Sequence, residues 1–98
     1  MFARVTVVDG DPDRLEAGTK MYSEQVLPAI QGVPGYKGSM LLANRTTGKG
    51  IGMSWWETEE ARAAGAEAVD QARKATVEEM GGTVPPVDEY EVMISDFR

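Results

Sequence analysis

Ser54-Trp55-Trp56-Glu57-Thr58 is the stretch that decides the fold, because it places both tryptophans of the chain side by side. It lies where a strand predicted for residues 50–56 meets a helix that begins after Thr58. Successive side chains of a strand point to opposite faces, so the two indole rings must enter different environments. A sheet with one face in water buries only its other face. The adjacent tryptophans therefore predict a sheet that is covered on both sides.

The composition excludes several classes of function. The 98 residues suit one domain, 1–98, and contain neither cysteine nor histidine. The chain thus lacks thiolate and imidazole ligands, the usual general base near neutral pH and the usual haem ligand. We expect no metal site and no cofactor. The net charge of −6 argues against nucleic acid and against anionic membrane surfaces, which both select basic proteins.

No export or membrane signal is predicted either. The first residues, MFARV, lack the basic region and long apolar run of a signal peptide. No apolar run in the sequence reaches the length of a membrane span. We therefore expect a soluble, cytoplasmic protein.

Turn residues and hydrophobic periodicity divide the chain into six elements in the order β-α-β-β-α-β. In chain order we predict a strand at 2–8, a helix at 11–31, strands at 36–44 and 50–56, a helix from 58 to near 80, and a strand at 89–97. Asp11 and Thr58 cap the two helices. Pro28 should loosen the last turn of the first helix, because it cannot donate to Glu24. Arg45 to Lys49 form a hairpin turn, Gly81-Gly82 end the second helix, and residues 84–87 are a linker.

This order predicts an α+β, ferredoxin-like fold: a four-stranded antiparallel sheet with both helices on one face. Neither side of the predicted strands is cleanly polar, although helices can cover only one side. A second copy of the chain is then expected on the other side, which gives a homodimer. Trp55, with Ile51 and Met53, is the candidate for the dimer core. Trp56 shares the helix side with Ser54.

Three short motifs are similar to a known family. They are Pro34-Gly35-Tyr36-Lys37-Gly38, the hairpin containing Gly48, and Trp56-Glu57-Thr58-Glu59-Glu60-Ala61. Together with the element order they resemble the antibiotic biosynthesis monooxygenase (ABM) domain of the dimeric α+β barrel superfamily. The resemblance implies a homodimer whose two sheets form a barrel, with a cavity in each subunit between sheet and helices.

The site residues of that family are mostly missing here. The haem-degrading members combine an asparagine on the first strand, a tryptophan ending the third and a histidine on the second helix. Only Trp56 matches, since the first strand offers Ala3 or Val5 on the helix side, so haem degradation is not expected. Quinone-forming, cofactor-free oxygenases of the family carry an asparagine ahead of the tryptophan, where this chain has Gly52.

Trp56, Ser54 and Tyr22 are the candidate cavity residues. Trp56 beside small residues leaves room for a flat aromatic ligand, or the indole simply packs under the second helix with Tyr22 or Met21 filling the gap. The Tyr22 hydroxyl either orients a substrate or reaches a backbone carbonyl. Arg4, placed on the other side of the first strand, is expected to pair with Glu91. Asp9, Asp11 and Asp13 resemble a metal loop, but helix capping explains Asp11 better and the rest of a calcium loop is missing.

Two functions remain open. The first is an oxidoreductase, a cofactor-independent monooxygenase or related enzyme acting on an aromatic or polyketide-like molecule, with Trp56 stacking the substrate. Its weakness is the missing base, because tyrosine and serine are poorly matched to proton abstraction near neutral pH. The second is a non-catalytic dimer that binds a small apolar ligand or serves as an interaction module. No catalytic residue is assigned from the sequence.

Overall fold

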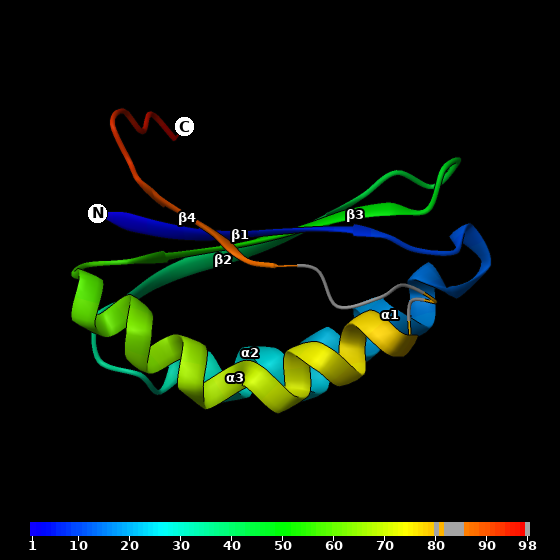
Figure 1. The fold of residues 1–98 in the computed structure, drawn as a ribbon, viewed down its shortest axis with the longest axis horizontal. Coiled ribbons are helices and arrows are strands. Elements are labelled where there is room, and N and C mark those ends of the chain that lie inside the picture. Colours follow the sequence, from blue (N-terminus) through cyan, green and yellow to red (C-terminus); the bar gives the residue numbers. More distant parts are fainter. Residues whose placement is uncertain (80, 82–85, 98) are drawn as a thin grey trace.

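The computed structural model describes residues 1–79, 81 and 86–97. Its strands are β1 (Phe2–Asp9), β2 (Tyr36–Ala43), β3 (Lys49–Trp56) and β4 (Asp88–Glu91), and its helices are α1 (Leu15–Met21), α2 (Leu27–Gln31) and α3 (Glu59–Glu79). The four strands form one antiparallel sheet in the order β2-β3-β1-β4. Both helical stretches cover the same face of this sheet (Figure 1). The predicted α+β, ferredoxin-like arrangement is confirmed.

The first helical stretch is interrupted as the sequence suggests. Asp11 caps an initial 3-10 turn (Pro12–Arg14), its carboxylate accepting from the Asp13 N–H at 2.9 Å. Between α1 and α2 the chain makes one turn of π-helix, Tyr22–Val26. In this turn the Leu27 N–H donates to the Tyr22 carbonyl, just before the proline that cannot donate to Glu24. The wide turn therefore lies where the proline removes the regular hydrogen bond.

The second helix, α3, begins and packs as its sequence dictates. The Thr58 hydroxyl accepts from the Ala61 N–H at 3.0 Å, which confirms the predicted N-cap. One turn later, Gly65 lies against the Trp56 ring, where an added Cβ would clash with the indole carbons. Gly65 thus lets the helix approach the sheet closely at Trp56. The helix ends before Gly81, whose φ of +80° favours glycine, while Gly82 and residues 84–85 of the predicted linker lie outside the described residues.

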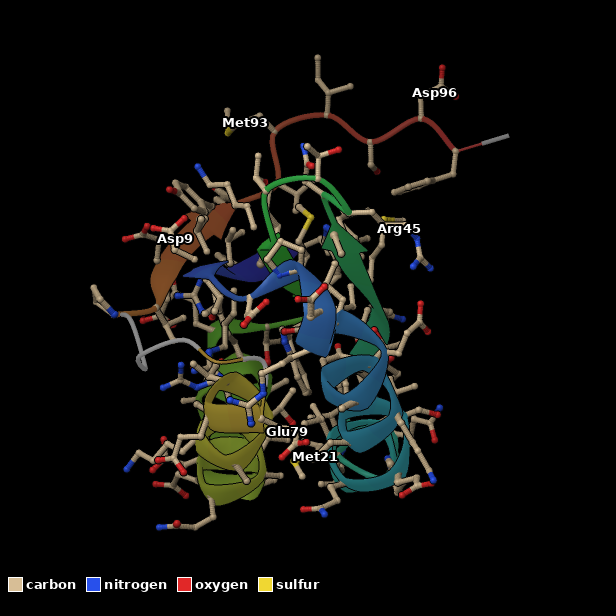
Figure 2. All side chains as sticks on the ribbon, turned by 90° about the vertical axis from the view of Figure 1, so that its right-hand side faces the viewer. Asp9, Met21, Arg45, Glu79, Met93 and Asp96 are labelled. Atoms are coloured by element: carbon tan, nitrogen blue, oxygen red, sulfur yellow. The ribbon has the colours of Figure 1, made fainter. Side chains whose placement is uncertain are left out.

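The last strand is shorter than predicted. It pairs with β1 only from Asp88 to Glu91, so the expected strand at 92–97 is wrong. The reason is that β1 begins at Phe2, the partner of Glu91, and leaves no strand residue opposite the rest. A final hydrogen bond joins the Val92 N–H to the Met1 carbonyl at 2.9 Å. Residues 92–97 then leave the sheet on the side away from the helices, as Figure 2 shows for Met93 and Asp96.

The register of β1 and β3 corrects one prediction. Residues directly opposite in an antiparallel pair share a face, and Arg4 lies opposite Ser54, whereas Ala3 lies opposite Trp55. Arg4, Thr6 and Val8 therefore face the helices together with Trp56. The prediction that Ala3 or Val5 occupies the helix side of the first strand is wrong. Periodicity gives two alternating sets of residues, but only pairing decides which set faces the helices.

Candidate binding cavity

A cavity of about 80 Å³ lies between the sheet and the helices. Strand β1 lines it with Arg4, Thr6 and Val8, and the π turn and α2 line it with Tyr22, Val26 and Ile30. Helix α3 contributes Val69, Arg73, Thr76 and Val77, and β2 contributes Leu41. The wall is therefore apolar except for a few groups that could orient a ligand.

Strand β3 forms the floor of the cavity and leaves part of it bare. Gly50 and Gly52 line it without side chains, and a Cβ added at Gly52 would meet only a Leu41 methyl group, at 4.0 Å. Met53 also contacts the cavity although the register places it with Val5 on the other face. The two glycines create the space that larger residues would fill.

Trp56 closes one end of the cavity. Its side chain is fully buried, and its ring meets that of Tyr36 edge-on with centroids 5.5 Å apart. The indole Nε1–H donates to the Ser54 hydroxyl at 2.8 Å, so both candidate residues meet in one hydrogen bond. Trp56 does pack under the second helix, against Gly65, as one of the two interpretations expected. The space beside the indole is nevertheless not filled. Trp56 and Ser54 are thus wall residues, and their role toward a ligand stays a prediction.

Tyr22 also lines the cavity, as expected, but its hydroxyl has an unexpected partner. It interacts with the hydroxyl of Ser39, which lies 2.8 Å from the Tyr36 hydroxyl. The expected bond to a backbone carbonyl is therefore replaced by a three-hydroxyl cluster. Burial raises the pKa of the Tyr22 phenol, and the Ser39 hydrogen bond opposes this shift. Tyr22 stays protonated at neutral pH.

Two arginines bring positive charge to the cavity wall. Arg4 comes from β1 and Arg73 from α3. Burial lowers the pKa of Arg4, and the nearby Arg73 lowers it further. Glu91 lies opposite Phe2 in the sheet and forms no ion pair with Arg4, so the predicted pairing is wrong.

The described residues hold no group of three or more Asp or Glu side chains placed to bind a metal ion. In the part of the chain that the structure describes, no helix is long and apolar enough to cross a membrane.

The sheet face opposite the helices, called here the open face, carries the candidate dimer residues. The register places Trp55, Met53 and Ile51 there, each half-buried. The Phe97 ring meets the Trp55 ring edge-on at 6.1 Å, because the last segment crosses this face. The dimer role of these residues stays a prediction.

Sequence reasoning missed the two arginines and the Ser39 hydroxyl. Arg73 follows Val69 by four residues and Gly65 by eight, so the helical period alone places it on the cavity side of α3. Arg4 required the pairing of two strands that are far apart in the sequence. Ser39 could have been found only from its position opposite Ser54, and that position depends on the register of β2 and β3.

The chain is similar to uncharacterised proteins. One protein of Mycobacterium tuberculosis is 37% identical over 92 residues, which are 94% of this chain and 41% of that protein. A second from the same organism is 31% identical over 94 residues, 96% of this chain and 39% of that protein. The chain thus spans about two-fifths of the length of these relatives. No protein-family model matches the chain.

Solved structures that superpose on this chain identify its fold. A candidate antibiotic biosynthesis monooxygenase from Deinococcus radiodurans superposes with a TM-score of 0.75 at 13% identity, over 100% of this chain and 98% of that one. The chain has the antibiotic biosynthesis monooxygenase (ABM) fold. A monooxygenase of Streptomyces coelicolor in complex with the ligand nanaomycin D shares this ABM fold, with a TM-score of 0.68 and 17% identity over 97% of this chain and 92% of that one. At these identities the likeness concerns the fold, and the activity must be argued from the cavity.

Proposed function

We propose that this chain binds a small, mainly apolar molecule, no larger than one aromatic ring, in the cavity between its sheet and its helices. The observation that carries the proposal is the unfilled space over Gly50 and Gly52, beside the buried ring of Trp56. Packed interiors contain few such voids, and an empty apolar cavity can take up a small apolar molecule.

The size of the cavity limits the ligand. Its volume is about 80 Å³, whereas a cavity of roughly 150 Å³ holds benzene and pockets for drug-sized ligands begin near 300 Å³. A fused three-ring molecule would require the helices to move away from the sheet. A single ring exceeds the present volume by less, so wall side chains such as Tyr22 or Leu41 would have to move to admit it.

Filling the cavity tests this proposal. Gly52→Val adds a side chain into the open space over the floor, so it should abolish saturation transfer from the protein to benzamide, a neutral single-ring probe. Gly32→Ala is the matched control, because a Cβ added there has no neighbour within 4 Å and lies away from the cavity. Equal transfer in wild type and Gly52→Val would overturn the proposal.

The same proposal includes a homodimer formed through the open face. Val7, Met40 and Leu42 are 40%, 41% and 43% exposed on or beside it, and Met93 and Ile94 of the last segment are 84% and 90% exposed. Apolar patches of this kind on a soluble protein mark an interaction surface. A second copy of the chain would bury the patch with an identical one, as two-fold symmetric dimers do.

A second candidate is a cofactor-independent monooxygenase, and Tyr22 is the observation that favours it. Its protonated phenol faces the cavity and could donate to an oxyanion on a bound substrate. The CH₂ group between the two carbonyls of a cyclic 1,3-dione is acidic enough to ionise at neutral pH, so a substrate of this kind needs no protein base. Oxidation of that CH₂ to a carbonyl by O₂ places one oxygen in the product and releases the other as water. The four electrons come from the substrate, so no other reductant is consumed.

Oxygen uptake separates this candidate from simple binding. With 1,3-cyclohexanedione as substrate, the monooxygenase would consume O₂ in proportion to protein, and Tyr22→Phe would reduce the rate by on the order of 100-fold, the usual effect of losing one oxyanion donor. Binding of benzamide without any protein-dependent O₂ uptake would leave the chain as a binding protein.

A further inference from the structure

The cavity wall carries two arginines, and the cations around Arg4 outnumber the carboxylates. Around Arg4 lie two other cations, Arg62 and Arg73, and two carboxylates, Asp70 and Glu89. Three cations thus meet two anions, in a chain whose net charge is −6. Of these groups, Arg4 and Arg73 line the cavity.

Both carboxylates are already engaged. Glu89 is bound by the Arg62 Nε at 2.7 Å, although Arg4 is its direct neighbour in the sheet. Asp70 is bound by the Lys74 Nζ at 3.2 Å and lies 3.9 Å from an Arg73 nitrogen. Among the described residues, Arg4 itself makes no hydrogen bond and no close ion pair.

Arg4 is half-buried on this apolar wall, which is unfavourable for its charge unless an anion compensates it. Burial of a charge without a partner is unfavourable, which is why buried guanidinium groups normally meet carboxylates or phosphates. Here the chain's own carboxylates serve other cations. Arg4 and Arg73 approach the cavity from opposite layers, sheet and helix, so a group bound between them would receive donors from both sides.

We propose that Arg4 and Arg73 form a carboxylate subsite, so that the ligand of this cavity is a small single-ring or branched carboxylic acid in its ionised form. The planar, two-donor edge of a guanidinium matches the two oxygens of a carboxylate. The apolar part of the ligand then lies over Gly52 toward Trp56. This inference rests on the proposed binding function and specifies its substrate class.

Benzoate and benzamide test the subsite, because they share size and ring and differ in the charge of one group. Trp56 lines the cavity, and its Nε1–H gives one of the two indole resonances of the chain, which Trp55→Phe assigns. Its shift during titration gives the dissociation constant of each probe. Benzoate should bind at least about tenfold more tightly than benzamide, the minimum for a hydrogen bond to a charged group.

The variant Arg4→Met keeps an unbranched apolar side chain and removes the charged guanidinium, so it should abolish the preference for benzoate while benzamide still binds. Arg45→Met is the matched control for net charge, because Arg45 is 80% exposed at the hairpin. Arg73→Met repeats the test on a helix position that does not depend on the sheet, should Arg4→Met fail to fold.

The outcomes separate the two levels of the proposal. If benzamide and benzoate bind wild type equally, or if both arginine variants keep the preference, the carboxylate subsite is overturned and the binding function stands. If neither probe shifts the Trp56 resonance, the binding function itself fails, and the subsite with it.

Discussion

At the residue scale, the cavity depends on side chains whose partners come from distant parts of the sequence. Trp56 donates to Ser54 two residues away, which a strand period predicts. Tyr22 reaches Ser39 and Arg4 lies opposite Ser54, and neither follows from local sequence. The sequence therefore identified Trp56, Ser54 and Tyr22 as neighbours of one space. It did not place Arg4 on the same side, because the register of β1 and β3 decides that.

The raised pKa of Tyr22 predicts how stability depends on pH. The ordinary pKa is 10.0, and burial raises it in the folded chain. The stabilisation from the neutral buried phenol is fully present below pH 10 and is lost as pH rises from there through the folded pKa, since the unfolded chain ionises first. The Tyr22→Phe variant has no phenol to ionise, so it does not lose stability in this way. Its free energy of unfolding should therefore fall less steeply than that of wild type above about pH 10.

Urea denaturation of both proteins at a series of pH values from neutral to alkaline measures this difference. The other titrating groups are common to the two proteins, so their contributions cancel, apart from the coupling with Tyr36, whose charge also raises the pKa of Tyr22. Parallel curves across the alkaline range would show that the Tyr22 phenol is not buried as described.

At the scale of the elements, most of the architecture is readable from the sequence. Turn residues, caps and periodicity give the order and bounds of the helices and of β1, β2 and β3 to within a residue or two. The exception is β4, predicted to reach 97 and ending at Glu91. Its apolar residues Met93, Ile94 and Phe97 look like a strand in isolation, but β1 begins too late to pair with them. Strand length is set by the partner as well as by the strand's own composition.

Gly65 tests how α3 lies on the sheet. In a free helix, replacing glycine by alanine stabilises by about 1 kcal/mol. Here the new Cβ would clash with the buried Trp56 ring, so Gly65→Ala should lower the free energy of unfolding by about 1–3 kcal/mol. The sign of the effect distinguishes a packed helix from one that lies loosely on the sheet.

Two further sets of variants show whether the effect of Gly65→Ala comes from its contact with Trp56. Gly32→Ala, with open space around the added Cβ, should change stability far less. In a Trp56→Phe background the smaller ring should relieve the clash, and the double-mutant cycle should give a coupling energy above about 0.5 kcal/mol. Stabilisation by Gly65→Ala in the wild-type background contradicts the described packing.

At the scale of the whole molecule, the sheet has two apolar faces and helices for only one. The adjacent tryptophans indicate this from the sequence, since Trp56 is buried under α3 and Trp55 remains half-buried on the open face. The last segment covers part of that face through Phe97. The sequence does not show what packs on the open face, because an apolar strand face has the same residue pattern whatever packs on it.

A dimer through the open face predicts a mass in solution of twice the 10.6 kDa of one chain. Val7→Arg places a charge on this face, beside Ile51, and should shift the mass toward the monomer, because a buried unpaired charge is strongly unfavourable. Ala68→Arg, on the exposed side of α3, should leave the dimer intact. Light scattering at micromolar concentrations measures all three, and a monomeric wild type would refute the dimer.

The central claim is that the helix side of the sheet binds a small ligand and the open face does not. The two indole N–H groups report on these two sides separately, since Trp56 lines the cavity and Trp55 lies opposite. Titration with benzoate, followed by two-dimensional ¹H–¹⁵N NMR, is the most direct measurement. We predict a saturable shift of the Trp56 resonance with little change at Trp55. A Trp56 resonance that stays fixed up to the solubility limit of benzoate, or that moves no more than Trp55, would contradict the account.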